Sequence, residues 1–92
     1  MTKATIFEFD ADWCGPCKSL KPIVEHVATE VTETVNVQYV NIDTQFDLAK
    51  KFNVRGVPMM VAVKGDQTPK LYANIRATEE NVRKIFQEAS TL

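Results

Sequence analysis

The chain has 92 residues, of which 45% are hydrophobic and 25% are charged. This length allows one compact core and excludes two domains, so residues 1–92 are expected to form a single domain. Eleven basic and twelve acidic side chains give a formal charge of -1, which provides no net positive field to favour nucleic acid or an anionic membrane.

The N-terminal residues and the cysteine count indicate a compartment. Glu8 interrupts the first apolar stretch before it reaches the length of a signal peptide, and no later stretch could span a bilayer. We therefore expect a cytoplasmic protein that does not enter a membrane. Its only cysteines are Cys14 and Cys17, and two cysteines so close together cannot stabilise a secreted fold by cross-linking distant segments. Their spacing therefore indicates redox or metal chemistry.

The first half of the chain predicts a strand, a long helix and a second strand. Residues 4–9 are rich in β-branched and aromatic side chains, as in a strand buried on both faces. From Pro16 to about Thr32, apolar residues recur at intervals of three and four, which is typical of an amphipathic helix. Pro22 should kink this helix without ending it, because the apolar stripe continues beyond it. The second strand is expected at residues 36–42.

A short helix and a third strand are predicted next. Thr44 is expected to cap the short helix, whose apolar side chains are Leu48, Ala49 and Phe52. Residues 55–58 then turn the chain into a strand at residues 59–63.

The last part of the chain predicts a reversal, a fourth strand and a final helix. Residues 65–67 reverse the chain, and the fourth strand is expected near residues 71–75. Thr78 is a suitable cap for the final helix, and Glu79 and Glu80 complement the helix dipole. The side chains expected to face inward from this helix are Val82, Ile85, Phe86 and Ala89.

The predicted order of elements is β-α-β-α-β-β-α. The first β-α-β unit should cross over right-handed and give parallel strands, whereas the short connection between the third and fourth strands requires an antiparallel hairpin. We therefore expect an α/β fold with a mixed four-stranded sheet flanked by helices on both faces.

Cys14 and Cys17 lie at the start of the long helix. Cysteines three positions apart are about one helical turn apart, which is within the Cα separation of about 4.4 to 6.8 Å that a disulfide needs. Unpaired N–H groups and the positive end of the helix dipole favour a thiolate at Cys14, and Cys17 should be less exposed. Cys14 is therefore expected to attack a substrate disulfide, and Cys17 to release the product.

Four neighbours of the cysteines bear on this chemistry. Gly15 allows close approach of another backbone, and Pro16 supplies a preset φ where its missing N–H does no harm. Asp10 and Asp12 are acidic and close in sequence, so they should oppose the formation of a thiolate.

Two other interpretations of the cysteine pair stay open: inert core thiols, or half of a zinc site. A tetrahedral zinc site would need two more ligands, and the only other soft candidate is His26, more than two helical turns beyond Cys17. We expect His26 to be an ordinary residue on the helix surface, and we expect no metal site.

The segment Trp13-Cys14-Gly15-Pro16-Cys17-Lys18, with Val57-Pro58 about forty residues later, resembles the thioredoxin family. The resemblance spans nearly the whole chain. It implies a thioredoxin-like fold, in a compact version without the N-terminal strand and helix of longer members. It also implies a thiol-disulfide oxidoreductase that reduces protein disulfides and needs no cofactor besides its cysteine pair.

The resemblance also implies a substrate-binding surface. Pro58 would be a cis-proline facing the two sulfurs, and the backbone of Val57 would pair with an extended substrate segment. Trp13 and Pro16, with Gly15 between the cysteines, would form a flat and mostly apolar docking surface. The alternatives are an ordinary turn proline at position 58 and a Trp13 packed in the core.

Glu8 is the most informative residue outside the cysteine motif. A carboxylate inside a buried strand is costly and usually becomes neutral or finds a specific partner. Glu8 falls where the family commonly has a buried aspartate, so the resemblance implies that it is the base that helps to ionise Cys17. The alternative is a glutamate exposed at an edge.

The chain departs from the family pattern at several positions. Tyr39 stands where a lysine is often found, which removes a cation and should raise the pKa of Glu8. Asp10 replaces a tryptophan, Met59 replaces a threonine, and the glycine common near Ile75 is absent. These changes leave the reaction intact but affect substrate preference and redox potential. Met59 and its neighbour Met60 are expected to pack within the strand.

The preferred function is a disulfide reductase, because the Gly-Pro pair between the cysteines goes with reducing family members. Its expected partners are proteins with disulfides and a flavin- and NADPH-dependent thioredoxin reductase or a similar donor, and we expect a monomer. A redox potential more negative than about -220 mV is expected. Two alternatives are a disulfide oxidase or isomerase, and a non-redox interaction module within a larger enzyme.

Overall fold

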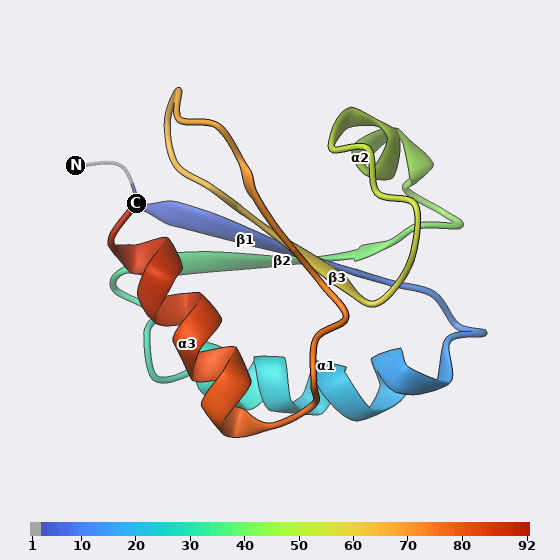
Figure 1. Cartoon of the computed structure of the whole chain (residues 1–92), viewed down its shortest axis with the longest axis horizontal. Helices are drawn as coiled ribbons and strands as arrows, with labels where there is room; N and C mark the ends of the chain where they lie inside the picture. The colour runs from blue at the N-terminus through green and yellow to red at the C-terminus, as the bar shows by residue number, and fades with distance from the viewer. Residues whose placement is uncertain (1–2) are drawn as a thin grey trace.

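A mixed four-stranded sheet forms the centre of this computed structural model, which describes residues 3–92 (Figure 1). The strands are β1 (Ala4–Asp10), β2 (Val35–Asn41), β3 (Met59–Val63) and β4 (Lys70–Ala73), in the order β2-β1-β3-β4. β1 is parallel to β2 and antiparallel to β3, which is in turn antiparallel to β4. The predicted mixed sheet is therefore confirmed.

Three helices cover the two faces of the sheet. α1 (Gly15–Ala28) and α3 (Glu79–Ser90) lie against one face, and the short α2 (Phe46–Lys51) lies on the other (Figure 1). This arrangement confirms the predicted α/β fold. Within residues 3–92, none of the helices combines the length and the apolar character needed to cross a membrane.

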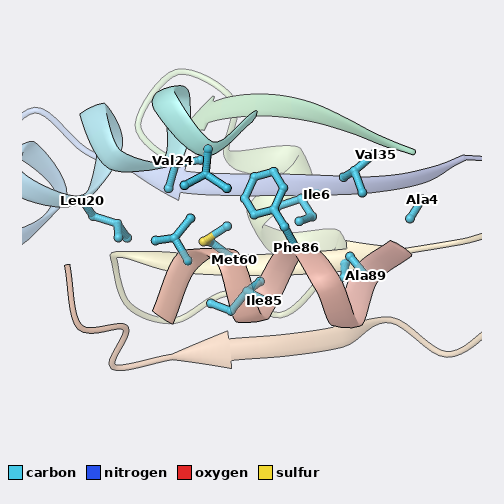
Figure 2. Close-up of a cluster of buried hydrophobic side chains, with 12 residues drawn as sticks. Ala4, Ile6, Leu20, Val24, Val35, Met60, Ile85, Phe86 and Ala89 are labelled. Carbon is cyan, nitrogen blue, oxygen red and sulfur yellow. The ribbon is translucent and has the colours of Figure 1, made fainter. Parts of the chain in front are cut away.

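The larger core lies between the sheet and the pair α1 and α3. Figure 2 shows Phe86 of α3 pointing toward the sheet, where Ile6 and Met60 lie, and Val24 of α1 lies beside it. A smaller core on the α2 side contains Phe9 and its neighbours. All four inward positions predicted for α3 are buried: Val82, Ile85, Phe86 and Ala89.

Strand alternation decides which residues of β1 face α1. Successive side chains of a strand point to opposite faces. Ala4 and Ile6 belong to the core under α1 and α3, whereas Phe7 and Phe9 belong to the core under α2. The next even-numbered positions, Glu8 and Asp10, therefore lie on the α1 face.

The helix α1 continues through Pro22 as predicted, but it ends at Ala28 and not near Thr32. Beyond Ala28 the chain continues in tight turns, in which the N–H groups of residues 29–31 donate to carbonyls three residues earlier. Val31 still packs against the core, although it has left the helix. The apolar stripe thus runs past the helix end, because a turn can place a side chain on the same surface.

Two smaller predictions are wrong at element ends. Thr44 does not cap α2: Gln45 precedes that helix without a side-chain cap, and the Thr44 hydroxyl donates to the Asn41 carbonyl instead. β4 is also shorter than predicted and ends at Ala73. The next residue, Asn74, has a φ of 54°, a left-handed conformation that asparagine tolerates better than most residues and that ends the strand.

Candidate functional site

Cys14 and Cys17 form a disulfide at the start of α1, at one end of the sheet. Their Cα atoms are 5.3 Å apart, within the range expected from their spacing. Cys14 is the N-cap residue of the helix, and Cys17 lies within its first turn. The two bonded cysteines therefore lie within about one turn of the helix start.

A backbone N–H in the first turn of α1 faces the Cys14 sulfur. The N–H of Cys17 donates a hydrogen bond of 3.2 Å to Cys14 Sγ. Pro16 lies at the start of the helix, where a missing N–H costs little, and the first turn of α1 contains no acidic side chain. This environment stabilises a negative charge on Cys14 once the disulfide is reduced.

The expected difference in exposure between the cysteines is not seen. Cys14 is 4% exposed and Cys17 is 3% exposed. Both pack against Ala11, with Ile42 and Val57 beside them. The two sulfurs differ in their place on the helix and not in burial, so only position at the helix terminus supports separate roles for them.

A groove lies beside the cysteines, next to Val57 and Pro58. The peptide bond between Val57 and Pro58 is cis, and Val57 packs against the cysteine cluster. The groove has a volume of about 510 Å³, and its lining includes Pro16, Pro58 and Met59. Met59 and Met60 are buried in β3, as predicted.

Trp13 lies on the surface directly before Cys14. Its side chain is 68% exposed, so the alternative of a core-packed tryptophan is wrong. The indole N–H donates a hydrogen bond of 3.0 Å to Asp43 Oδ2. Gly15 and Pro16 are also exposed, and no atom lies within 4 Å of the place where a Cβ on Gly15 would be. These three residues form an open surface next to the disulfide.

Glu8 is completely buried in the middle of β1, so the alternative of an edge-exposed glutamate is wrong. It pairs with Tyr39 of β2 on one side and with Met60 of β3 on the other. Burial, followed by hydrogen bonding and charge repulsion from Asp10, raises the pKa of Glu8 to about 8. Glu8 is therefore mostly protonated at neutral pH.

Lys21 supplies a cation near Glu8, in place of the lysine that is missing at position 39. Its Nζ lies 5.4 Å from the centre of the Tyr39 ring and 3.7 Å from Asp10 Oδ2, and its charge lowers the pKa of Glu8. The Glu8 pKa is nevertheless raised, as predicted. Its main cause is burial and not the loss of a cation from β2.

Sequence reasoning missed the places of Asp10 and Lys21 in this site. The sequence predicts that Asp10 opposes the Cys14 thiolate and departs from a family tryptophan, whereas in the structure it is buried on the Glu8 face of β1 and lines a pocket with Cys17 and Lys21. Two signals were present in the sequence. Positions 8 and 10 share a face of a strand, and positions 17 and 21 share a face of a helix.

His26 is exposed on α1, as expected, with Nε2 at 3.7 Å from Glu30 and 3.5 Å from Glu79. Within residues 3–92, no three or more His, Cys, Asp or Glu side chains are grouped so that they could hold a metal ion.

Known proteins resemble this chain along most of its length. A family model described as thioredoxin matches residues 1–87. Thioredoxin-T of Drosophila melanogaster is 37% identical over 86 residues, which make up 94% of this chain and 54% of that protein. The bifunctional thioredoxin reductase/thioredoxin of Mycobacterium leprae is 35% identical over 68 residues, which make up 74% of this chain and 15% of that protein. The chain thus spans about half the length of the first relative and a small part of the second.

The fold is also found in a solved structure. The crystal structure of the thioredoxin of Malassezia sympodialis matches with a TM-score of 0.82 and 27% sequence identity, covering 96% of this chain and 78% of that one.

Proposed function

Because this chain belongs to the thioredoxin family, we propose that it is a thiol-disulfide oxidoreductase that reduces disulfide bonds in other proteins. One observation carries this proposal. The two cysteines are within bonding distance at the start of α1, where the N–H of Cys17 points at the Cys14 sulfur. The pair can therefore alternate between dithiol and disulfide while the scaffold stays in place.

The proposed reaction has two exchange steps. In the first, the Cys14 thiolate attacks one sulfur of a substrate disulfide, which forms a mixed disulfide and releases the other sulfur as a thiolate. In the second, Cys17 loses its proton and attacks Cys14, so that the Cys14–substrate bond breaks. The substrate gains two electrons and its thiolates take up two protons, and the cysteine pair becomes a disulfide.

Glu8 is proposed as the base of the second step. It lies on the face of β1 that α1 covers, and Cys17 is on α1. A base with a pKa of about 8 is well matched to a thiol, whose ordinary pKa is about 8.5. The proton that Cys17 loses can therefore move to Glu8 at little cost.

The groove beside Val57 and Pro58 is the proposed substrate site. It adjoins Pro16, and its walls are mostly apolar, which suits an extended peptide segment. The backbone of Val57 precedes β3 and would pair with that segment. Trp13, Gly15 and Pro16 would contact the substrate on the exposed side of the cysteines.

The proposed partners are disulfide-containing proteins and a thioredoxin reductase or a similar donor. The name of the Mycobacterium leprae relative joins a reductase and a thioredoxin in one protein, which supports this donor class. We further propose that the protein acts as a cytoplasmic monomer. Its redox group is its own cysteine pair, so the reaction needs no bound cofactor, and neither nucleic acid nor a membrane takes part.

Reduction of insulin disulfides tests the function, and single cysteine variants test the roles. In the presence of dithiothreitol, the wild type should reduce insulin, and so make it precipitate, faster than dithiothreitol does alone. Cys17→Ser should accumulate a covalent adduct with an insulin chain, whereas Cys14→Ser should form none, because only Cys14 attacks the substrate. An adduct on Cys17 alone would reverse the two roles.

The redox potential separates a reductase from an oxidase. Equilibration with glutathione should give a potential more negative than about -220 mV, and a value near -150 mV would contradict the assignment as a reductase. If the Cys14→Ser/Cys17→Ser double variant kept the full biological activity, the protein would instead be a non-redox module.

A further inference from the structure

Two carboxyl groups lie next to each other on the buried face of β1. Glu8 is 0% exposed and Asp10 is 9% exposed. Glu8 is mostly protonated at neutral pH, so if it serves as the base of the proposed exchange reaction, it must lose this proton before it can accept the proton of Cys17. Glu8 has no contact with solvent, so another group has to carry that proton.

Asp10 is the polar partner of Glu8. Neither carboxylate oxygen of Glu8 meets an N–H or O–H donor within the described residues, so an ionised Glu8 would be unsatisfied. Asp10 Oδ2 lies on the same face of β1 and is likewise buried without a hydrogen-bond donor. When protonated, Glu8 can donate its O–H to Asp10, and hydrogen bonding with Asp10 is one of the causes that raise the Glu8 pKa. A single proton can therefore satisfy both buried carboxyl groups.

Asp10 is also close to solvent. It lines a pocket of about 350 Å³ whose other walls include Cys17 and Lys21, and Glu8 does not line this pocket. Asp10 thus connects the buried face of β1, where Glu8 lies, with the open pocket that Cys17 lines.

The other groups around the pair do not offer a second route. From α1, Lys21 lowers the pKa of Glu8 and Glu25 raises it, and neither is among the hydrogen-bond partners of Glu8. From β2, Tyr39 pairs with Glu8 and has its own pKa raised by burial and by Glu25 and Glu8. From β3, the neighbour of Glu8 is Met60, which carries no proton.

We propose that Asp10 relays the proton between the buried Glu8 carboxyl and the open pocket beside Cys17, and thereby supplies the ionised Glu8 that the second exchange step needs. The inference rests on the proposed oxidoreductase function and on Glu8 as its base. Asp10 acts through Glu8 and is a positioning and relay residue for a proton, not a residue that attacks the substrate.

Protons are conserved along this relay. Glu8 first passes its proton to Asp10, and Asp10 releases it to water in the pocket. Cys17 then gives its thiol proton to the ionised Glu8 while its sulfur bonds to Cys14 and the substrate sulfur leaves as a thiolate. Cys17 has then lost one proton, solvent has gained one, and both carboxyl groups have returned to their starting state.

The test compares Asp10→Asn with Asp12→Asn in single-turnover kinetics of the second step as a function of pH. Asp12 lines the same pocket but is exposed, so its replacement removes an equal charge without touching Glu8. If Asp10 relays the proton, Asp10→Asn should lower the rate at pH 7, where most of Glu8 is protonated, by about tenfold, a fraction of what acid–base catalysis contributes. The rate well above pH 8 should stay unchanged, because Glu8 is then already ionised. The first step and the Asp12→Asn variant should stay at wild-type rates.

A purely electrostatic role would give a different pattern. The charge and hydrogen bond of Asp10 raise the Glu8 pKa, so Asp10→Asn must also move the midpoint of the pH profile to lower pH. A shift of the midpoint alone would ionise more Glu8 at pH 7 and raise the rate there, and that result would overturn the relay. In Asp10→Ala, formate should enter the vacated space and restore most of the rate at pH 7, and it should have no effect on Asp12→Ala.

Carbon NMR of the wild type provides a second test that needs no variant. When Glu8 titrates near pH 8, the side-chain carboxyl carbon of Asp10 should shift as well, because Asp10 interacts with the Glu8 proton. A Glu8 transition that leaves the Asp10 carbon unmoved would contradict the proposal. If the wild type reduces insulin but Asp10→Asn keeps or exceeds the wild-type rate at pH 7, the relay fails and the proposed function stands; if the wild type does not reduce insulin, the proposed function fails first.

Discussion

The indole of Trp13 is hydrogen-bonded to the carboxylate of Asp43, 30 positions later in the chain. Asp43 is itself held in place, because its N–H donates a hydrogen bond of 2.9 Å to the side chain of Asn41 at the end of β2. A large apolar ring is thus fixed at the surface beside the disulfide, where it would otherwise rotate freely. Fixing it reduces the entropy that a partner must overcome on docking.

Asp43→Ala should weaken substrate docking through this ring. We expect the KM for insulin to rise by about twofold to fivefold, as expected for the loss of one hydrogen bond, while kcat and the redox potential stay unchanged. Steady-state insulin reduction and glutathione equilibration measure these quantities. In a Trp13→Phe background, which lacks the indole N–H, Asp43→Ala should have no further effect; an equal rise in KM there would show that Asp43 acts independently of Trp13.

Glu8 should make the oxidised protein less stable as the pH rises. The pKa of Glu8 is about 8 in the folded protein and has its ordinary value of 4.5 in the unfolded chain, so between these values the folded state holds a proton that the unfolded state has lost. The free energy of unfolding should therefore fall with rising pH in this window, by up to about 1.4 kcal/mol per pH unit. Urea unfolding between pH 5 and pH 8 measures the slope.

The matched variants are Glu8→Gln and Glu25→Gln. Glu8→Gln should remove most of the slope and make the protein about 2 to 3 kcal/mol more stable at pH 7, because a neutral amide has no charge to bury. Glu25 is exposed on α1, and its replacement should leave most of the slope in place. An unchanged slope in Glu8→Gln would mean that Glu8 titrates normally.

Glu8→Gln should also separate the two exchange steps. The amide cannot accept the Cys17 proton, so release of the mixed disulfide at pH 7 should slow by about a hundredfold, the lower end of acid–base catalysis. The first attack by Cys14 should change by much less, since the helix start stabilises that thiolate. Stopped-flow traces that show equal slowing of both steps would remove Glu8 from the reaction.

Phe86→Leu should lower stability without changing the redox chemistry. Phe86 is buried in the core between α3 and the sheet (Figure 2), whereas the disulfide lies in a separate cluster with Ala11. The smaller side chain should cost about 1 to 2 kcal/mol in the free energy of unfolding. The redox potential should equal that of the wild type, and a shift of the potential would show that the two clusters are coupled.

Most of the fold could be predicted from local patterns. The strand at residues 59–63 and the cap at Thr78 are found as predicted, because β-branched runs and capping side chains act over a few residues. The ends of α1, α2 and β4 could not be predicted as well. Val31 keeps its apolar contact after the helix has ended, and Asn74 ends β4 through a left-handed conformation that alternation does not reveal.

For the candidate site, too, one part could be predicted from the sequence and another part could not. The sequence alone determined the redox pair, because two cysteines three positions apart at a helix start must lie one turn apart whatever surrounds them. Only the tertiary structure decided how the charges around Glu8 are arranged. Asp10 and Lys21 belong to different elements, and their 3.7 Å contact arises from the packing of α1 on β1. Burial and charge interactions depend on these through-space distances, and no local pattern in a sequence contains them.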